Sequence, residues 1–231
     1  MKPICFIPAR GSSKGVRRKN IRLLGKKPLI AYTIESAISS KLFQHVMVST
    51  ENKAIATTAK NYGAEIPFMR PNELAKDNTT TDKVLLHGIK KLQKIGIESD
   101  IIVLRDCTVP FIDKTDLSKA LDLLNKEDCD GVFGAIKAHP NPYFGMMELN
   151  AEGYLIPSKH AKRKITRRQD APVVYDVDGM FLLKTQNFLK TRKIYSGKIL
   201  PYEISKQHGH MIDLEFDFKV AELLIKENLN M

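Results

Sequence analysis

The sequence predicts an α/β fold in which a mostly parallel, doubly wound (Rossmann-like) sheet carries helices on both faces. Short apolar runs alternate with segments of helical periodicity along most of the 231 residues. Repeated strand–helix units of this kind are typical of parallel sheets, because parallel strands need a crossover connection. The hydrophobic content of 43% is enough for a sizeable core, and the length suits a single domain over residues 1–231.

The expected elements follow from these patterns in chain order. Apolar runs predict strands at 4–7, 46–49, 101–104, 131–136 and 180–183, with a short extended piece at 64–68. Helical spacing and capping residues predict helices that begin at Pro28 and Asp113 and others that cover 52–62, 80–96 and 216–229. Residues 70–78 read as a loop.

The pattern breaks over about 138–175, which is rich in Pro, Gly, Lys and Arg and has little helical periodicity. We interpret this stretch as an insertion in the domain that forms a lid, an arm or a subunit contact.

The composition limits the partners and the compartment. Lys and Arg number 37 against 26 Asp and Glu, a net charge of +11, which favours an anionic partner such as a nucleotide, a sugar acid or a nucleic acid. The basic clusters at 14–27 and 159–168 contain no Phe or Tyr, although nucleic-acid binders often interleave aromatic residues with basic ones. Three cysteines without CxxC spacing argue against a disulfide framework and a zinc site. No leader or membrane span is recognisable, so we expect a cytoplasmic protein.

The loop at 8–20 follows the first strand and combines features that suit the binding of a polyphosphate. Gly11 and Gly15 allow the backbone to approach a ligand closely, and exposed N–H groups in such a loop form an anion-binding concavity. The loop also carries five cationic side chains, Arg10, Lys14, Arg17, Arg18 and Lys19. Its spacing matches neither the Walker loop nor the dinucleotide fingerprint. A solvated basic loop and a non-specific nucleic-acid patch remain alternatives from the residue types alone.

Two carboxylates are candidates for a metal site. Asp106 follows a buried strand, so it should face the same crevice as the loop at 8–20, because ligands bind beyond the carboxyl ends of parallel strands. Asp213 precedes the last helix. Either residue could simply cap a helix or turn, yet magnesium is typically held by one or two carboxylates together with substrate phosphates. A basic loop and two crevice carboxylates are the components expected for metal-assisted nucleotide transfer.

Seven segments, in order along nearly the whole chain, resemble the acylneuraminate cytidylyltransferases, which are the CMP-sialic acid synthetases and their legionaminate and pseudaminate relatives. The first is Pro8-Ala9-Arg10-Gly11-Ser12-Ser13-Lys14-Gly15, followed by Arg18-Lys19-Asn20. The others lie at 25–34, 48–51, 70–75, 106–111, 166–172 and 212–217.

The resemblance implies a fold of the nucleotide-diphospho-sugar transferase type and a Mg²⁺-dependent reaction. The anomeric hydroxyl of a nonulosonic (sialic-acid-like) acid attacks the α-phosphate of CTP, and pyrophosphate leaves. The resemblance also implies a homodimer in which the insertion at 138–175 is a dimerisation arm that reaches the neighbouring subunit's site. A cytidylyltransferase for another acidic sugar, such as 3-deoxy-octulosonate, is the alternative enzyme. A basic nucleic-acid-binding domain is the alternative from another class, although no nucleic acid or membrane partner is expected.

The resemblance also assigns roles to residues. The catalytic candidates, which contact the triphosphate, are Arg10, Lys14 and Lys19. The nucleotide-binding candidates are Ala9, Gly11, Ser12, Asn20, Arg70, Thr80, Thr81 and Asp106. The candidates for binding the sugar acid are Arg168, Gln169 and Asp178, and those for the metal are Asp213 and Asp106.

Three departures from the family pattern bear on these roles. Met211 stands where sialic acid synthetases typically carry the first aspartate of an Asp-Ile-Asp motif, which leaves Asp213 with Asp106 for the metal. Asp176 stands where some sialate-specific members have an arginine, and its carboxylate would repel that of the sugar. Arg17 replaces the usual proline and adds a cation to the loop.

Overall fold

The computed structural model describes residues 2–13 and 15–228, and a six-stranded sheet forms its centre. In sheet order the strands are β10 (Ile199–Glu203), β6 (Gly131–Lys137), β9 (Tyr175–Lys184), β5 (Ile101–Arg105), β1 (Ile4–Pro8) and β4 (His45–Ser49). β1 pairs in parallel with β4 and β5, and β10 pairs in parallel with β6, whereas β9 runs antiparallel to both of its neighbours. The predicted mostly parallel α/β sheet is confirmed.

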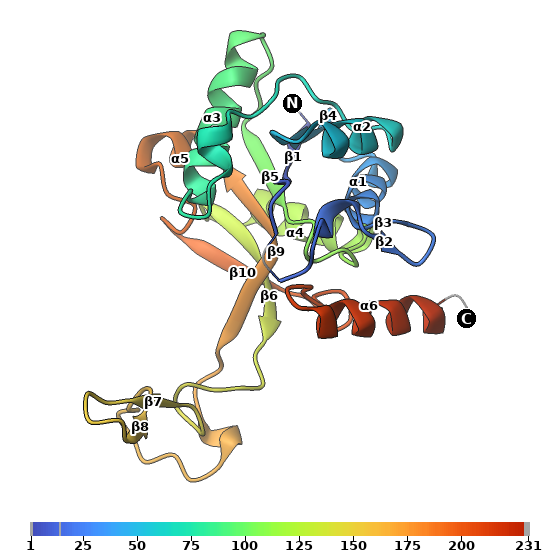
Figure 1. The fold of residues 1–231 in the computed structure, drawn as a ribbon. Coiled ribbons are helices and arrows are strands. Elements are labelled where there is room, and N and C mark those ends of the chain that lie inside the picture. Colours follow the sequence, from blue (N-terminus) through green and yellow to red (C-terminus); the bar gives the residue numbers. More distant parts are fainter. Residues whose placement is uncertain (1, 14, 229–231) are drawn as a thin grey trace.

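Helices cover both faces of this sheet, as Figure 1 shows. In chain order they are α1 (Leu29–Ser40), α2 (Lys53–Asn61), α3 (Thr81–Lys94), α4 (Lys114–Lys126), α5 (Thr185–Thr191) and α6 (Glu215–Asn228). Alternate residues of β5 show the division. Val103 packs with Leu117 of α4 on one face, and Leu104 packs with Leu85 of α3 on the other. This alternation follows from the two-residue repeat of a strand.

Capping residues set several helix starts. The Asn52 side chain accepts hydrogen bonds from the first turn of α2, and Asp113 forms a capping box with Asp116 at α4, as expected for such residues. Pro28 is the N-cap of α1, so that helix begins one residue later than predicted. The end predicted for the last helix, at residue 229, lies outside the described residues.

Most of the elements that the sequence did not predict lie in the C-terminal half. β9 begins at Tyr175 rather than at residue 180, and Gly179, with φ +79°, lies where the pairing register with β6 shifts. The helix α5 and the edge strand β10 were not predicted. A two-strand ribbon, β2 (Leu23–Leu24) with β3 (Lys27–Pro28), was also missed. The extended piece predicted at 64–68 makes a single β-bridge, between Met47 and Glu65.

Residues 138–175 project from the body as an arm at the far ends of β6 and β9 (Figure 1). The arm contains a hairpin of β7 (Met147–Leu149) and β8 (Leu155–Pro157). Large apolar side chains on this hairpin are exposed, with Leu149 70% and Leu155 65% accessible. Among the residues that the structure describes, no helix is both long enough and apolar enough to cross a membrane.

Candidate active site

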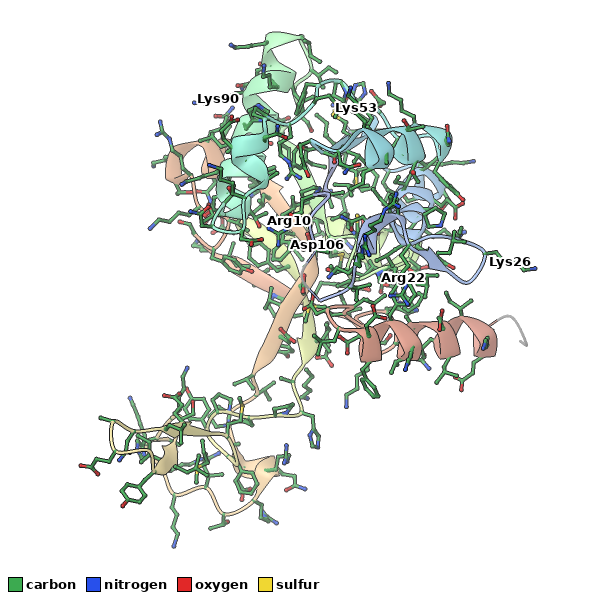
Figure 2. The ribbon with its side chains drawn as sticks, viewed as in Figure 1. Arg10, Arg22, Lys26, Lys53, Lys90 and Asp106 are labelled. Carbon is green, nitrogen blue, oxygen red and sulfur yellow. The ribbon has the colours of Figure 1, made fainter. Side chains whose placement is uncertain are left out.

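A cavity of about 590 Å³ lies beyond the carboxyl ends of β1 and β5, where an α/β sheet normally binds its ligands. Four segments line it: the loop after β1, residues 70–84 around the start of α3, the turn after β5, and the residues before α6. Figure 2 places Arg10 and Asp106 together at this edge of the sheet, whereas Lys26, Lys53 and Lys90 point outward at the periphery. The predicted meeting of the 8–20 loop with Asp106 is thus observed.

Hydrogen bonds fix the peptide between Arg10 and Gly11 from both sides. The Asn20 amide donates to the Arg10 carbonyl at 2.9 Å, and the Gly11 N–H donates to a carboxylate oxygen of Glu51 at 2.6 Å. Asn20 is itself buried, so water does not compete for its hydrogen bond to Arg10. The backbone at the start of the loop is therefore held in one orientation, but the N–H of Gly11 is already used within the protein. Gly11 has no other hydrogen-bond donor, so it does not donate to a phosphate while Glu51 holds its N–H.

The loop approaches the segment before α6 so closely that Gly15 must be glycine. A Cβ atom at this residue would lie 2.0 Å from the carbonyl oxygen of Asp213, and real Cβ atoms essentially never come within 3.0 Å of another heavy atom. Close backbone approach is a common reason for glycine in a loop. The contact brings residues about two hundred positions apart in the sequence to the same wall of the cavity.

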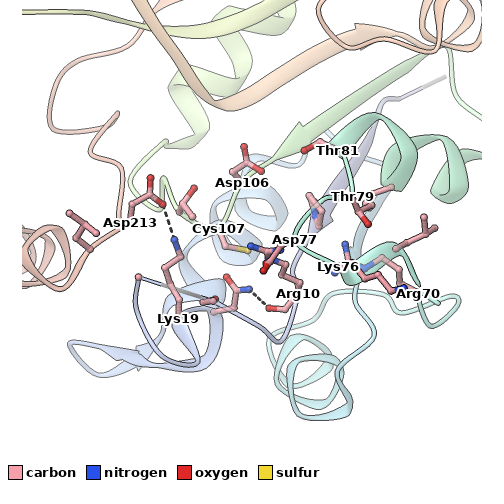
Figure 3. A pocket seen from close by; sticks show the side chains of 18 residues that line it. Arg10, Lys19, Arg70, Lys76, Asp77, Thr79, Thr81, Asp106, Cys107 and Asp213 are labelled. Atoms are coloured by element: carbon pink, nitrogen blue, oxygen red, sulfur yellow. Dashed lines mark hydrogen bonds and ion pairs between the residues drawn. The ribbon is translucent and has the colours of Figure 1, made fainter. Parts of the chain in front are cut away.

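Lys19 is the cationic residue most firmly placed in the cavity (Figure 3). Its Nζ atom donates to the Ile212 carbonyl at 2.7 Å and to Asp213 Oδ1 at 3.0 Å. The lysine side chain is only 12% exposed, whereas that of Asp213 is 57% exposed. The ammonium group is therefore held by its own backbone contact, and the aspartate is free to turn toward solvent.

Arg10 also lines the cavity, and its Nη1 atom pairs with Asp77 Oδ1 at 2.9 Å. Both side chains are substantially exposed, so the pair lies in a screened environment. Asp77 belongs to the segment between the Arg70 loop and α3 and was not singled out from the sequence. Lys14, the third catalytic candidate, lies outside the described residues.

Arg70 lines the side of the cavity next to α3 and is almost completely buried. Its Nη2 atom donates to Glu51 Oε2 at 2.9 Å, and its backbone N–H donates to the carbonyl of Thr50. Thr81 faces the cavity nearby, whereas Thr80 is the N-cap residue of α3. Two residues that the sequence analysis did not select, Lys76 and Thr79, share this wall (Figure 3).

Asp106 and Asp178 form a carboxyl pair at the floor of the site. The Asp106 backbone donates to the Gly179 carbonyl at 3.0 Å, which places the two aspartates next to each other. Burial, and then the neighbouring Asp178 carboxyl, raise the pKa of Asp106 to about 8, although Arg105 and Lys19 act in the opposite direction. Burial also raises the pKa of Asp178. Like charges in contact cannot both ionise without cost, so the two raised pKa values favour one proton on the pair, and a bound cation would favour its loss.

The donor set fits Mg²⁺. Asp106 and Asp213 line the same cavity, and their oxygen atoms are the ligands that Mg²⁺ prefers. Within the described residues, three potential metal-ligating side chains are already clustered at Asp113, Asp116 and His208. That cluster lies at the start of α4, where Asp116 closes a capping box, and we assign it a structural role.

Arg168 and Gln169 are not among the residues that line this cavity. They line a separate cavity of about 460 Å³ at the base of the arm, together with Lys137 and Lys206. The Arg168 guanidinium donates to the His139 carbonyl. Of the remaining candidates, Ala9 is buried, Ser12 is exposed and Asp178 is half-buried beside Asp106.

Comparison with known proteins gives consistent matches over the whole chain. A family model described as cytidylyltransferase matches residues 4–230. The chain is 33% identical over 224 residues to the CMP-N,N'-diacetyllegionaminic acid synthase of Campylobacter jejuni serotype O:2, covering 96% of this chain and 94% of the relative. It is 32% identical over 234 residues to a pseudaminic acid cytidylyltransferase of Campylobacter jejuni serotype O:23/36, covering 99% and 98%. A solved CMP:2-keto-3-deoxy-manno-octonic acid synthetase complexed with CTP has the same fold, with a TM-score of 0.71 at 15% identity, covering 99% of this chain and all of that one.

Proposed function

The chain belongs to the cytidylyltransferase family, and on this premise we propose that it transfers CMP from CTP to the anomeric hydroxyl of a nonulosonic acid and releases pyrophosphate. The observation that carries the proposal is the single cavity that joins the glycine-containing basic loop to Asp106 and Asp213. The two Campylobacter relatives act on legionaminic and pseudaminic acids by name, which supports an acceptor of this class.

The loop and its cations account for binding of the triphosphate. Arg10 and Lys19 face the cavity. Charge-assisted hydrogen bonds from such groups to phosphate oxygens are stronger than neutral hydrogen bonds. Negative charge builds up on the leaving pyrophosphate, so donors fixed before reaction stabilise that state without reorganisation. Lys19 meets this requirement because the Ile212 carbonyl already positions its ammonium group. Arg70 and Thr81 also line the cavity, and we assign them to the cytosine base.

We assign Asp106 and Asp213 as the residues that hold Mg²⁺. A bound Mg²⁺ ion would neutralise phosphate oxygens of CTP. Asp213 would be available to hold it because its side chain is 57% exposed, and Lys19 would then be available to the triphosphate. Asp106 would bind as a carboxylate and release to solvent the proton that burial and the neighbouring Asp178 favour in the metal-free protein.

We propose that the arm completes the site of a neighbouring subunit in a homodimer. Arg168 lies on the arm, away from the cavity of its own chain, and the arm hairpin exposes apolar side chains that a partner could cover. A guanidinium group pairs well with a carboxylate, so Arg168 with Gln169 suits the acid group of the sugar, and Asp178 suits its hydroxyl groups. The three cysteines are unpaired, which supports a reducing, cytoplasmic setting.

The activity is tested by measuring pyrophosphate release from CTP and Mg²⁺ with legionaminate, pseudaminate, sialate and 3-deoxy-octulosonate. We expect release with at least one of the first three. Release with octulosonate alone would move the assignment to another acidic sugar. Release with none of them, together with tight and salt-dependent binding to DNA or RNA, would instead support a nucleic-acid-binding protein.

The metal assignment predicts that Asp213→Asn lowers turnover by about 100-fold, a size typical of losing one electrostatic contact to the transition state. Calorimetry should still detect CTP binding, because Arg10 and Lys19 remain. Asp122→Asn, an exposed change on α4, is the matched control and should leave turnover unchanged. Wild-type turnover in Asp213→Asn would show that this residue serves only the start of α6.

The arm assignment is tested by mixing two inactive variants, Arg168→Ala and Lys19→Ala. If the arm serves the neighbouring subunit, mixed dimers contain one site in which both residues are intact, and activity returns on mixing. Activity that stays at the level of the separate variants would contradict the assignment.

A further inference from the structure

Glu51 lies between two parts of the site that are far apart in the sequence. It follows β4 by two residues, and its side chain is mostly buried. One carboxylate oxygen accepts the Gly11 N–H at 2.6 Å, and the other accepts Arg70 Nη2 at 2.9 Å. The same carboxylate therefore joins the loop at 8–20, called the phosphate-binding loop below, to Arg70 on the side of the cavity that we assign to the base.

Both contacts are strong and leave Glu51 with little freedom. Hydrogen bonds to a charged carboxylate are shorter and stronger than neutral ones, and the Arg70 side chain is only 4% exposed. The adjacent backbone adds a further link, because the Thr50 carbonyl accepts the N–H of Arg70 at 2.9 Å. Glu51 thus fixes the Arg10–Gly11 peptide, which Asn20 holds from its other end.

The contacts also decide what kind of role this residue has. Glu51 is not among the residues that line the cavity, and both of its oxygens already have partners. These contacts do not suit a metal ligand or a general base. Removing one partner of a buried ion pair leaves the other charge uncompensated, so the loss of Glu51 would release Arg70 from its position.

We propose that Glu51 is a positioning residue that sets the distance and orientation between the phosphate-binding loop and Arg70, so that the two sites together match one CTP molecule. This inference rests on the proposed function. It makes Glu51 a determinant of nucleotide choice, although it touches no substrate. A nucleotide that binds the loop correctly would, without Glu51, no longer present its base to a fixed guanidinium group.

Glu51→Gln separates the two contacts. The amide oxygen can still accept the N–H of Gly11, but the amide NH₂ group then faces the donor of Arg70 and cannot accept from it. Glu73→Gln is the matched control, because Glu73 is an exposed glutamate in the short 3-10 helix Asn72–Ala75 after Arg70 and does not line the cavity. The dissociation constants of CTP, UTP and inorganic tripolyphosphate are measured by calorimetry with Mg²⁺ and no sugar acid.

In Glu51→Gln we expect CTP binding to weaken by about 10- to 100-fold, as for an angstrom-scale displacement of a binding group. The preference for CTP over UTP should fall with it, whereas tripolyphosphate binding should stay within about threefold, because the loop keeps its hydrogen bond to residue 51. Glu73→Gln should match the wild type in all three. A merely structural role would lower the melting temperature and leave the CTP preference unchanged at temperatures where the variant is folded.

An unchanged CTP preference in Glu51→Gln, or an equal loss in Glu73→Gln, would overturn the inference. If Glu51→Gln does not fold, Glu51→Asp answers the same question, because it keeps the charge but is too short to reach both partners. If the wild type itself binds neither CTP nor UTP, the proposed function fails, and that outcome is distinct from failure of the Glu51 role.

Discussion

The contact between Gly15 and the segment before α6 leads to a sharp prediction for Gly15→Ala. The new Cβ would lie 2.0 Å from the Asp213 carbonyl oxygen, against a practical limit of 3.0 Å, so one of the two backbones must move by at least about 1 Å. The backbone around Asp213 is held by hydrogen bonds that oppose this movement. Asp217 accepts the N–H groups of Asp213 and Leu214, and the N–H of Ile212 donates to the carbonyl of Thr108.

The expected effect follows from this displacement. A shift of about 1 Å in a catalytic group can cost about 100-fold in rate, and Asp213 and Lys19 would both move relative to the loop. Overpacking of this kind also costs roughly 1–3 kcal/mol of stability. Initial rates of pyrophosphate release at saturating CTP and sugar acid measure the first effect, and urea unfolding measures the second.

Gly88→Ala provides the control for stability. Its Cβ would lie 2.4 Å from the Phe6 ring in the core, so it should lower the free energy of unfolding without moving the wall formed by Asp213. We expect near wild-type turnover from Gly88→Ala at a temperature where it is folded. The reasoning is refuted if Gly15→Ala keeps more than about a third of wild-type turnover, or if Gly88→Ala loses as much.

Two further predictions concern charged groups that line the cavity. Asp77→Asn should lower the KM for CTP by up to about fivefold, because Asp77 competes with phosphate for Arg10 in an exposed pair worth about 0.2–1 kcal/mol. The effect should be clearest at low salt, where exposed charges are least screened. A higher KM would mean that Asp77 holds Arg10 in position for CTP instead. Asp106→Asn should remove a pH dependence of stability in metal-free protein. With the pKa of Asp106 raised from 3.8 to about 8, the folded state keeps a proton that the unfolded chain has released, so the free energy of unfolding falls as pH rises from about 4 to about 8. Urea unfolding across this range in EDTA checks the difference in slope, and equal slopes for the two proteins would contradict the shift.

The candidate site could be predicted from the sequence because strand ends carry geometric information. The apolar runs before residue 8 and before Asp106 both read as buried strands, and parallel strands end at the same edge of a sheet. Their meeting in one cavity follows from that rule. Asp213 was a candidate from its position before the last helix, but only the resemblance assigned it to the metal, since a short stretch before a helix gives no hint of the strand end beside which it lies.

The missed features depend on pairings between distant residues. β9 is antiparallel because the chain returns to the sheet through the arm, and no local pattern records that direction. β10 lies at the sheet edge and contains Pro201, which weakens its strand pattern. Glu51 and Asp77 were passed over because a lone carboxylate in a loop has many possible roles. Their partners, Gly11 and Arg10, are 40 and 67 residues away.

Three ion pairs between described residues surround the cavity, and their exposure separates them into two kinds. Asp77 and Asp213 are 51% and 57% exposed, whereas Glu51 is 14% exposed. Pairs with an exposed carboxylate typically contribute about 1 kcal/mol or less, so phosphates can replace the two aspartates as partners of Arg10 and of the less exposed Lys19 at small cost. Breaking a buried pair costs about 3–5 kcal/mol, more than a substrate contact normally returns. Nucleotide binding should therefore replace the aspartate partners of Arg10 and Lys19 with phosphate and leave the Glu51–Arg70 pair intact. The first two pairs then exchange one anion for another, and the third keeps the geometry of the site fixed.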